Sequence, residues 1–270
     1  MKTLRIGVVQ LCSTADVDAN LAALAREVAR CAERGATLVF TPENTGWLRI
    51  GDAATPRHDL QTCPTVARSR QLAREHGISI LLGSTLLTED GAADTATNTS
   101  LLIDADGEIR VRYDKLHLFA VDLGPETRFD ESNHVRAGTT PASVDFEGLR
   151  IGMSICYDLR FPELYRAYAA SGCTLLSIPA AFTERTGRDH WEPLLRARAI
   201  ENQCYVVAAA QWGHHGGKRT SYGHSMVIDP WGTVVAQASD GIGSVVAELD
   251  FERLQQVRAS LPCLQHRRAI

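Results

Sequence analysis

One order of segments occurs twice in this chain, and that repeat constrains the fold more than any other feature. Short apolar runs typical of strands alternate with segments whose apolar residues recur at helical spacing. The matching runs are residues 6–8, 36–43, 79–82 and 100–107 in the first half and residues 151–153, 173–180, 204–207 and 225–232 in the second. A chance recurrence of apolar strands is the alternative, but their shared order favours a true repeat.

Each half has the pattern of an α/β unit. The expected elements of the first half are strands at 6–10, 37–40, 78–82 and 100–103, a helix that follows Asn20 and ends at Gly35, a helix from Pro64 to about Gly77, and a turn at 104–107. One half alone would leave an apolar sheet face uncovered. We therefore expect an α/β fold of four layers, an α-β-β-α sandwich. No linker or low-complexity tract divides the chain, so residues 1–270 are expected to form a single domain.

Composition excludes several classes of function. The chain has 270 residues, 44% of them hydrophobic and 22% charged, which is typical of a globular protein. Its net charge of -4 predicts no nucleic-acid partner and no anionic membrane surface. No apolar run reaches the roughly 18 residues of a membrane span, and the amino terminus has no signal-peptide pattern. The 7 cysteines are scattered and form no CxxC pair, which predicts reduced thiols and a cytoplasmic location.

The repeat is broken at three chemically reactive positions, each near the end of an expected strand. A residue that only one half carries is poorly explained by the fold that both halves share. The three pairs are Glu43 and Ala180, Lys115 and Asp240, and Cys156 and Leu11. Loops at strand ends build the sites of α/β sheets, so we expect the carboxylate, the amine and the thiol to converge there.

These three groups make a coherent set for attack on a carbonyl carbon. A thiol needs a base at neutral pH, and a carboxylate can accept its proton. An ammonium group can hold the oxyanion that forms. The structural alternatives are a buried apolar role for Cys156, a loop or cap carboxylate for Glu43, and a solvated surface amine for Lys115.

Three motifs resemble the signatures of the nitrilase superfamily of carbon–nitrogen hydrolases. They are residues 41–44 (Thr-Pro-Glu-Asn), residues 113–119 (Tyr-Asp-Lys-Leu-His-Leu-Phe) and residues 154–163 around Cys156. The resemblance covers nearly the whole chain and implies an α-β-β-α sandwich with a Glu-Lys-Cys triad. Glu43 would be the general base, Lys115 an oxyanion donor and Cys156 the nucleophile.

The same resemblance assigns two supporting groups. The backbone N–H of Tyr157 would be the second oxyanion donor. Glu131 matches the second glutamate of the superfamily, which orients the lysine; a surface carboxylate in an acidic turn is the alternative. The chemistry implies no cofactor and no metal. The adjacent histidines His214 and His215 lack further ligands at metal-binding spacing.

Blocks in the second half resemble the deaminated glutathione amidase branch of the superfamily. These blocks are residues 182–187, 190–192, 195–201, 209–211, 221–224 and 265–268. In that branch, the residues that match Arg160, Phe182 and Thr186 contact the oxo-dicarboxylate part of the substrate. An ion pair with Glu163 is the alternative role of Arg160.

Two positions depart from the branch. Ala120 replaces an aspartate, and Asp189 replaces a small residue. These two substitutions bear on which amide substrate the enzyme prefers, and they do not affect the Glu-Lys-Cys triad.

We therefore expect a cytoplasmic amidase with a small-molecule amide substrate, a thioester intermediate on Cys156 and a homodimeric assembly. The expected substrate is deaminated glutathione, cleaved to 2-oxoglutarate and cysteinylglycine. The alternatives are an omega-amidase acting on 2-oxoglutaramate, a non-catalytic metabolite-binding protein on the same fold, and a Cys-His hydrolase with His117 or His190 as its base.

Overall fold

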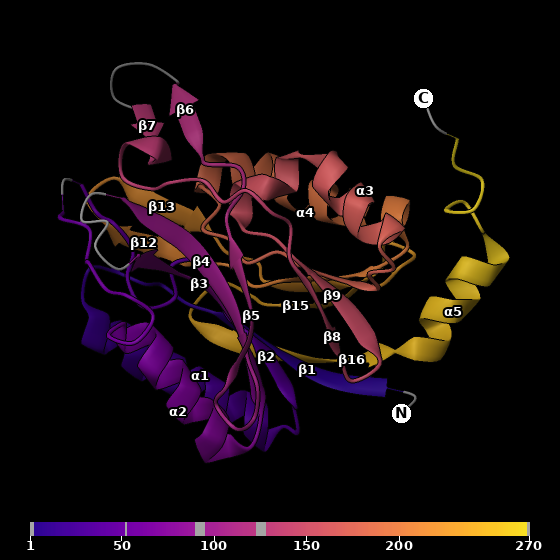
Figure 1. The fold of residues 1–270 in the computed structure, drawn as a ribbon, viewed down its shortest axis with the longest axis horizontal. Helices are drawn as coiled ribbons and strands as arrows, with labels where there is room; N and C mark the ends of the chain where they lie inside the picture. Colours follow the sequence, from indigo (N-terminus) through magenta and orange to yellow (C-terminus); the bar gives the residue numbers. More distant parts are fainter. Residues whose placement is uncertain (1–2, 52, 90–94, 123–127, 269–270) are drawn as a thin grey trace.

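Two six-stranded sheets pack face to face in the computed structural model, which describes residues 3–51, 53–89, 95–122 and 128–268 (Figure 1). The first sheet has the order β16 (Gly243–Asp250), β1 (Thr3–Gln10), β2 (Leu38–Phe40), β3 (Ser79–Thr88), β4 (Ala96–Ile103) and β5 (Ile109–Asp114). The second has the order β8 (Ser143–Phe146), β9 (Leu149–Met153), β10 (Leu175–Ser177), β11 (Tyr205–Ala208), β14 (Met226–Ile228) and β15 (Val234–Gln237).

Helices cover the outer face of each sheet. The helices are α1 (Val17–Glu33) and α2 (Pro64–His76) on the first sheet, and α3 (Pro162–Ala170) and α4 (Glu184–Asn202) on the second (Figure 1). A fifth helix, α5 (Phe251–Ser260), follows β16 beside the sandwich. Two small antiparallel strand pairs are formed by β6 (Ala120–Asp122) with β7 (Arg128–Asp130) and by β12 (Trp212–Gly216) with β13 (Arg219–Tyr222). The expected α-β-β-α sandwich is thus confirmed.

Alternating side chains explain why both faces of each sheet are covered. In β1, Val8 points into the core between the sheets, and Val9 packs into the core beneath α1 and α2. In β11, Val207 and Val206 make the same division between the central core and the core beneath α3 and α4. Successive strand residues point to opposite faces, so a strand that is apolar throughout requires this layered burial.

The predicted repeat is present in the sheets. The order β1-β2-β3-β4-β5 of the first sheet corresponds to the order β9-β10-β11-β14-β15 of the second. The sixth strand differs in origin: β8 pairs antiparallel with β9 through a hairpin, whereas β16 returns from the end of the chain to pair antiparallel with β1. The first sheet is therefore completed by the last strand of the protein.

The sequence analysis placed the start of the first helix too far along the chain. The helix α1 starts at Val17, because Asp16 is the N-cap and accepts a hydrogen bond from the Ala19 N–H. Asn20, the expected start, is buried and donates to the Gly46 carbonyl. The second helix agrees with the prediction, since it begins at Pro64 and ends at Gly77 in a left-handed conformation.

Strands β3 and β4 extend beyond the predicted residues 78–82 and 100–103. The extension of β4 contains the buried polar residues Thr97, Asn98 and Thr99, which an apolar pattern does not detect.

Among the described parts of the chain, no helix has the length and apolar character required to cross a bilayer.

Candidate active site

Glu43 lies in a tight loop that follows β2, and its side chain is buried. The Thr41 hydroxyl accepts a hydrogen bond from the Gly83 N–H of β3, and the Thr45 hydroxyl donates to the Pro42 carbonyl. Gly83 lets the strand approach this loop, because a Cβ there would lie 1.9 Å from the Thr41 carbonyl oxygen. The loop backbone therefore holds the carboxylate in one place.

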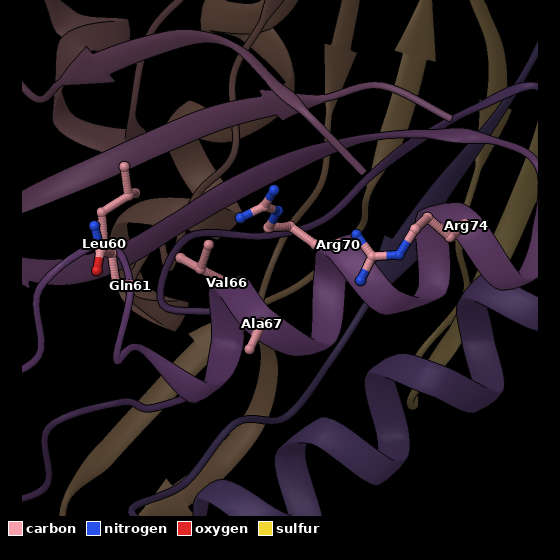
Figure 2. A pocket seen from close by; sticks show the side chains of 6 residues that line it. All are labelled: Leu60, Gln61, Val66, Ala67, Arg70 and Arg74. Carbon is pink, nitrogen blue, oxygen red and sulfur yellow. The ribbon is translucent and has the colours of Figure 1, made fainter. Parts of the chain in front are cut away.

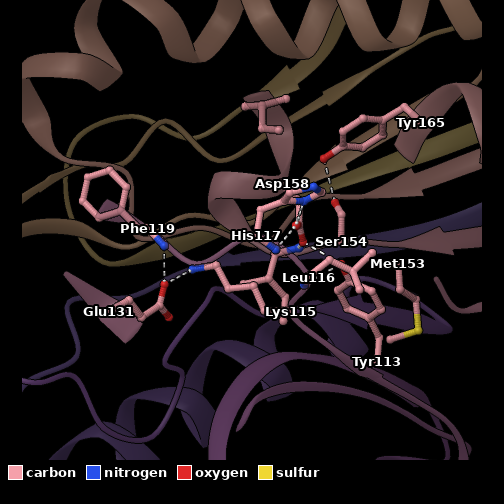
Figure 3. A network of polar contacts seen from close by, with 12 residues as sticks. Tyr113, Lys115, Leu116, His117, Phe119, Glu131, Met153, Ser154, Asp158 and Tyr165 are labelled. Carbon is pink, nitrogen blue, oxygen red and sulfur yellow. Dashed lines mark hydrogen bonds and ion pairs between the residues drawn. The ribbon is translucent and has the colours of Figure 1, made fainter. Parts of the chain in front are cut away.

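Lys115, the first residue after β5, lies between two carboxylates. Its Nζ is 2.8 Å from Oε1 of Glu43 and 2.8 Å from Oε2 of Glu131. Glu131 begins a short 3-10 helix, η1 (Glu131–Asn133), and its Oε2 also accepts the Phe119 N–H at 2.8 Å (Figure 3). The Asn98 amide donates to Oε1 of both glutamates, at 2.9 Å and 3.1 Å. Lys115 is 1% exposed, so its ammonium group is held and not solvated.

Cys156 is buried beside Glu43 and has a strained backbone. It begins η2 (Cys156–Arg160), a 3-10 helix, with a φ of 49° in the left-handed region, which non-glycine residues rarely adopt. Its N–H donates to the Pro179 carbonyl at 2.8 Å, and its thiol hydrogen-bonds to the Glu43 carboxylate. The Oε2 atom of Glu43 accepts the Ala181 N–H at 2.9 Å, while its Oε1 accepts from Lys115.

Asp158 connects the loops that carry Cys156 and Lys115. Its fully buried carboxylate accepts hydrogen bonds from the Tyr113 hydroxyl at 2.7 Å, from the Ile155 N–H at 2.8 Å and from the His117 N–H at 3.0 Å (Figure 3). The His117 ring bonds to the same carboxylate through Nδ1 at 2.7 Å and stacks on Phe161. The His117 ring is therefore engaged by Asp158 and Phe161, while the Glu43 carboxylate interacts with the thiol.

Burial and charge set the protonation of the three central groups. Burial alone would raise the Glu43 pKa, but the charge and hydrogen bond of Lys115 outweigh it and lower the pKa. Burial would lower the Lys115 pKa, but the charges of Glu131 and Glu43 hold it well above its ordinary value. Burial and the charge of Glu43 raise the pKa of the Cys156 thiol. At neutral pH the site thus holds a carboxylate, an ammonium and a neutral thiol.

The expected substrate-binding residues gather beside Cys156. The Arg160 guanidinium lies 5.1 Å from the Phe182 ring centroid and 6.0 Å from that of Tyr157. Arg160 also lies 3.3 Å from His190 Nδ1, and within the described ranges it forms no ion pair with Glu163.

Three further positions named in the sequence analysis are Thr186, Ala120 and Asp189. Thr186, in the first turn of α4, bonds to the Thr183 hydroxyl at 2.8 Å. The two departures, Ala120 and Asp189, are both exposed.

The family follows from a comparison of the whole chain with known proteins. Residues 5–259 match the model of the carbon-nitrogen hydrolase family. The chain belongs to this family. It is accordingly a carbon–nitrogen hydrolase, as the motifs around Glu43, Lys115 and Cys156 predict.

Known relatives align with this carbon–nitrogen hydrolase over nearly its full length. A deaminated glutathione amidase from Yersinia enterocolitica is 40% identical, with 100% of this chain and 95% of the relative covered. The crystal structure of the Caenorhabditis elegans NitFhit protein has a TM-score of 0.91 at 42% identity, covering 99% of this chain and 66% of that one. The structure of Saccharomyces cerevisiae Nit3, a member of the nitrilase superfamily, has a TM-score of 0.88 at 29% identity, with 99% and 97% covered.

The motifs did not indicate several residues that support this centre. Asn98 bridges the two glutamates, and Gln211 donates from Nε2 to the Glu43 carbonyl at 2.9 Å. The polar run of residues 97–99 within a strand is the signal that could have identified Asn98. Gln211 comes from the opposite half of the chain and lies in the block 209–211, whose resemblance to the amidase branch did not indicate its contact with Glu43.

A surface hollow elsewhere carries no such chemistry. Figure 2 shows side chains of α2 and of the segment before it that line a hollow of about 290 Å³, and none of them belongs to the centre. Its Arg70 already donates to the Gly107 carbonyl and pairs with Glu108. Within the described residues, no group of three or more histidine, cysteine, aspartate or glutamate side chains is arranged to hold a metal ion.

Proposed function

We propose that Cys156 is the nucleophile of this carbon–nitrogen hydrolase, with Glu43 as its base and Lys115 as an oxyanion donor. The observation that carries the proposal is the buried contact of the neutral thiol with an ionised carboxylate that an ammonium group holds in place. A cysteine with a raised pKa is unreactive until a base accepts its proton during attack. Glu43 contacts the thiol and can accept that proton.

The proposed reaction has two halves. In the first, the Cys156 sulfur attacks the amide carbon as its proton moves to Glu43, and the oxyanion is held by Lys115 Nζ and the Tyr157 N–H. Glu43 then gives the proton to the departing nitrogen, the carbon–nitrogen bond breaks and a thioester remains. In the second half, Glu43 takes a proton from water, which attacks the thioester, and the thiol regains a proton as the acid leaves.

Glu131 is proposed to keep the Lys115 ammonium group protonated and oriented towards the oxyanion. The ammonium stays protonated because two carboxylates contact it, and its position stays fixed because both contacts are 2.8 Å. A donor that is already oriented needs little reorganisation when charge develops on the substrate oxygen.

We infer that the substrate is deaminated glutathione, which is cleaved to 2-oxoglutarate and cysteinylglycine. The name of the relative from Yersinia enterocolitica supports this inference. So does Arg160, because a guanidinium over the Phe182 ring can pair with a substrate carboxylate in a bidentate manner. Phe182 and Thr186 complete the proposed site for the oxo-acid half.

A comparison of two substrates tests the inference. We expect kcat/KM for deaminated glutathione to exceed that for 2-oxoglutaramate by roughly tenfold or more, because the dipeptide adds contacts that position the carbonyl. A preference for 2-oxoglutaramate would identify an omega-amidase. Absence of hydrolysis with both would refute both substrates and leave only the general amidase assignment.

Trapping the intermediate tests the nucleophile and the base. Acid quench within one turnover, followed by peptide mass spectrometry, should locate the acyl group on Cys156 in the wild type. Glu43→Gln should lose acylation and His117→Ala should retain it; the reverse pattern would favour the Cys-His alternative. Cys156→Ala removes little volume, so it should abolish turnover with an unchanged circular dichroism spectrum.

We also propose a homodimer in a reducing compartment such as the cytoplasm. The presence of seven free cysteines, five of them buried, supports the compartment. Light scattering at micromolar concentration measures the assembly, and a monomer would refute the dimer. Thiol titration of protein alkylated in cells measures the redox state, and a disulfide would refute the compartment.

A further inference from the structure

Arg160 is a cation beside the reaction centre that has no carboxylate partner among the described residues. It is the last residue of η2, the short helix that Cys156 begins. Its guanidinium lies over the ring of Phe182, and the Ala181 N–H, one residue earlier, donates to the Glu43 carboxylate at 2.9 Å. Chain connectivity and hydrogen bonds thus place Arg160 next to the nucleophile and its base. The side chain is only half-buried, so a ligand can reach it.

One imidazole contacts this guanidinium. The Nδ1 atom of His190, on α4, lies 3.3 Å from Nη1 of Arg160. A guanidinium only donates hydrogen bonds, so Nδ1 must be the acceptor and the ring must carry its proton on Nε2. His190 is exposed, and it forms no ion pair with any carboxylate of the described ranges. The contact therefore gives the guanidinium a partner without neutralising its charge.

The helix α4 also holds the backbone of η2. Arg198, which is buried, donates from Nε and Nη2 to the Leu159 carbonyl at 3.1 Å and 2.7 Å. Leu159 immediately precedes Arg160, so the backbone is fixed where the arginine side chain begins. The side chain itself has many rotamers, which stacking on the Phe182 ring and the bond to His190 restrict. Within the part of the chain that the structure describes, His190 is the one hydrogen-bond partner of this guanidinium.

We propose that His190 is a positioning residue that orients Arg160 for the carboxylate of the acyl half of the substrate, and so sets the preference for amides of 2-oxo dicarboxylic acids. The inference rests on the proposed function, in which Arg160 pairs with that carboxylate. Bidentate pairing needs two N–H groups in one orientation, and the bond to His190 occupies Nη1 on one side while other N–H groups stay available. An arginine that is already oriented loses less conformational entropy when the substrate binds. His190 should therefore lower KM and leave kcat nearly unchanged.

A matched pair of substrates tests the role of His190. Deaminated glutathione is compared with 4-oxopentanoyl-cysteinylglycine, the analogue in which a methyl group replaces the carboxylate of the oxo-acid end. For the wild type, kcat/KM should favour the acid by roughly ten- to a hundredfold, as expected for hydrogen bonds to a charged group. In His190→Leu this ratio should fall by roughly three- to tenfold, through a higher KM for the acid. His190→Asn should restore the ratio, because its Oδ1 can replace Nδ1 as the acceptor.

A double variant tests whether His190 acts through Arg160. Arg160→Met should reduce the ratio of acid to methyl ketone to about one, and adding His190→Leu should change it by less than about twofold. A further loss of preference in the double variant would show that His190 contacts the substrate itself and would overturn the positioning role. The control is Arg188→Met, because Arg188 is an exposed residue of the same helix that pairs with Glu184. It should keep the wild-type ratio and KM.

The remaining outcomes separate this inference from the proposed function. A wild-type ratio in His190→Leu, or a ratio that His190→Asn does not restore, would overturn the positioning role and leave the proposed function intact. Equal kcat/KM for the two substrates in the wild type would overturn the pairing of Arg160 with the carboxylate, and the role of His190 with it. Failure of the wild type to cleave deaminated glutathione would overturn the proposed substrate. Because His190 is exposed, both of its variants should melt at the wild-type temperature.

Discussion

At the scale of single residues, the centre combines groups from both halves of the repeat. Glu43 in the first half accepts a hydrogen bond from Ala181, the neighbour of its own counterpart Ala180. Cys156 in the second half donates its N–H to Pro179 and directs its thiol to Glu43. Neither half could build this arrangement alone, because each supplies what the other lacks.

Lys115→Met tests the charge between the two glutamates. We expect kcat to fall by roughly 10²–10³, the range for the loss of an oxyanion donor. Steady-state kinetics with deaminated glutathione measures the effect. A rise in KM with unchanged kcat would show that Lys115 serves ground-state binding and not the oxyanion.

Asn98→Ala tests the bridge between Glu43 and Glu131. Hydrogen bonds to charged groups contribute about 1.5–3 kcal/mol, so misplacement of the two carboxylates should reduce kcat by roughly ten- to a hundredfold. Because Asn98 acts through Glu43, single-turnover kinetics should show slow acylation with KM nearly unchanged. Unaltered acylation would assign Asn98 to structure only.

The pKa shifts of Glu43 and Lys115 predict how stability depends on pH. Glu43 has a pKa below its ordinary 4.5 in the folded protein, so its contribution is complete above that pH and is lost as pH falls through the folded value. Lys115 has a raised pKa, so its contribution is complete below 10.5 and is lost only at higher pH.

The difference in unfolding free energy between the wild type and Glu43→Gln should be level from about pH 5 to 9 and shift against the wild type in acid. Urea denaturation at stepped pH measures it. A difference that changes between pH 6 and 8 would show that another group controls the site.

At the scale of elements, the contact of β3 with the Glu43 loop depends on the missing side chain of Gly83. A Cβ there would meet the carbonyl oxygens of Thr41 and Pro42 at 1.9 Å and 2.5 Å. Gly83→Ala must therefore displace the loop, and we expect lower thermal stability together with lower kcat. Gly243→Ala is the control, because a Cβ at that position would have no other atom of the described residues within 4 Å. Equal melting temperatures for the two variants would contradict the close approach.

Local sequence patterns predicted most helices and strands correctly, but they missed features that depend on contacts with residues distant in the sequence. The helix α2 followed from Pro64 and Gly77, whose backbone preferences are local. The start of α1 was misplaced because Asn20 resembles a cap, while its amide actually bonds to a distant loop. The motifs identified Glu43, Lys115 and Cys156 as candidates, and the structure shows that these residues lie close together. The polar run at residues 97–99 and the block 209–211 mark Asn98 and Gln211 in the sequence, but their contacts with Glu43 are tertiary and follow from no local pattern.

At the scale of the whole molecule, the central core needs both sheets. Apolar side chains of β1 and β2 pack against those of β9 and β10, and β16 covers the edge of β1. We therefore propose that residues 1–270 form one cooperative domain. Chain fragments 3–141 and 142–268 should each fail to fold alone, because each leaves one sheet face uncovered.

Calorimetry of the intact chain should show a single transition whose calorimetric and van't Hoff enthalpies agree. Two separate transitions, or a fragment with a sharp melting curve of its own, would contradict a single domain.

The placement of β16 has a consequence for synthesis of the protein. The strand β1 is complete at Gln10, but its neighbour β16 begins only at Gly243. At about 5–20 residues per second, the ribosome needs roughly 10–50 s to produce the intervening chain. Throughout that interval the nascent first sheet presents an open edge, which is a surface that promotes aggregation. Production of this protein should therefore depend on chaperones that shield a nascent edge strand until translation ends.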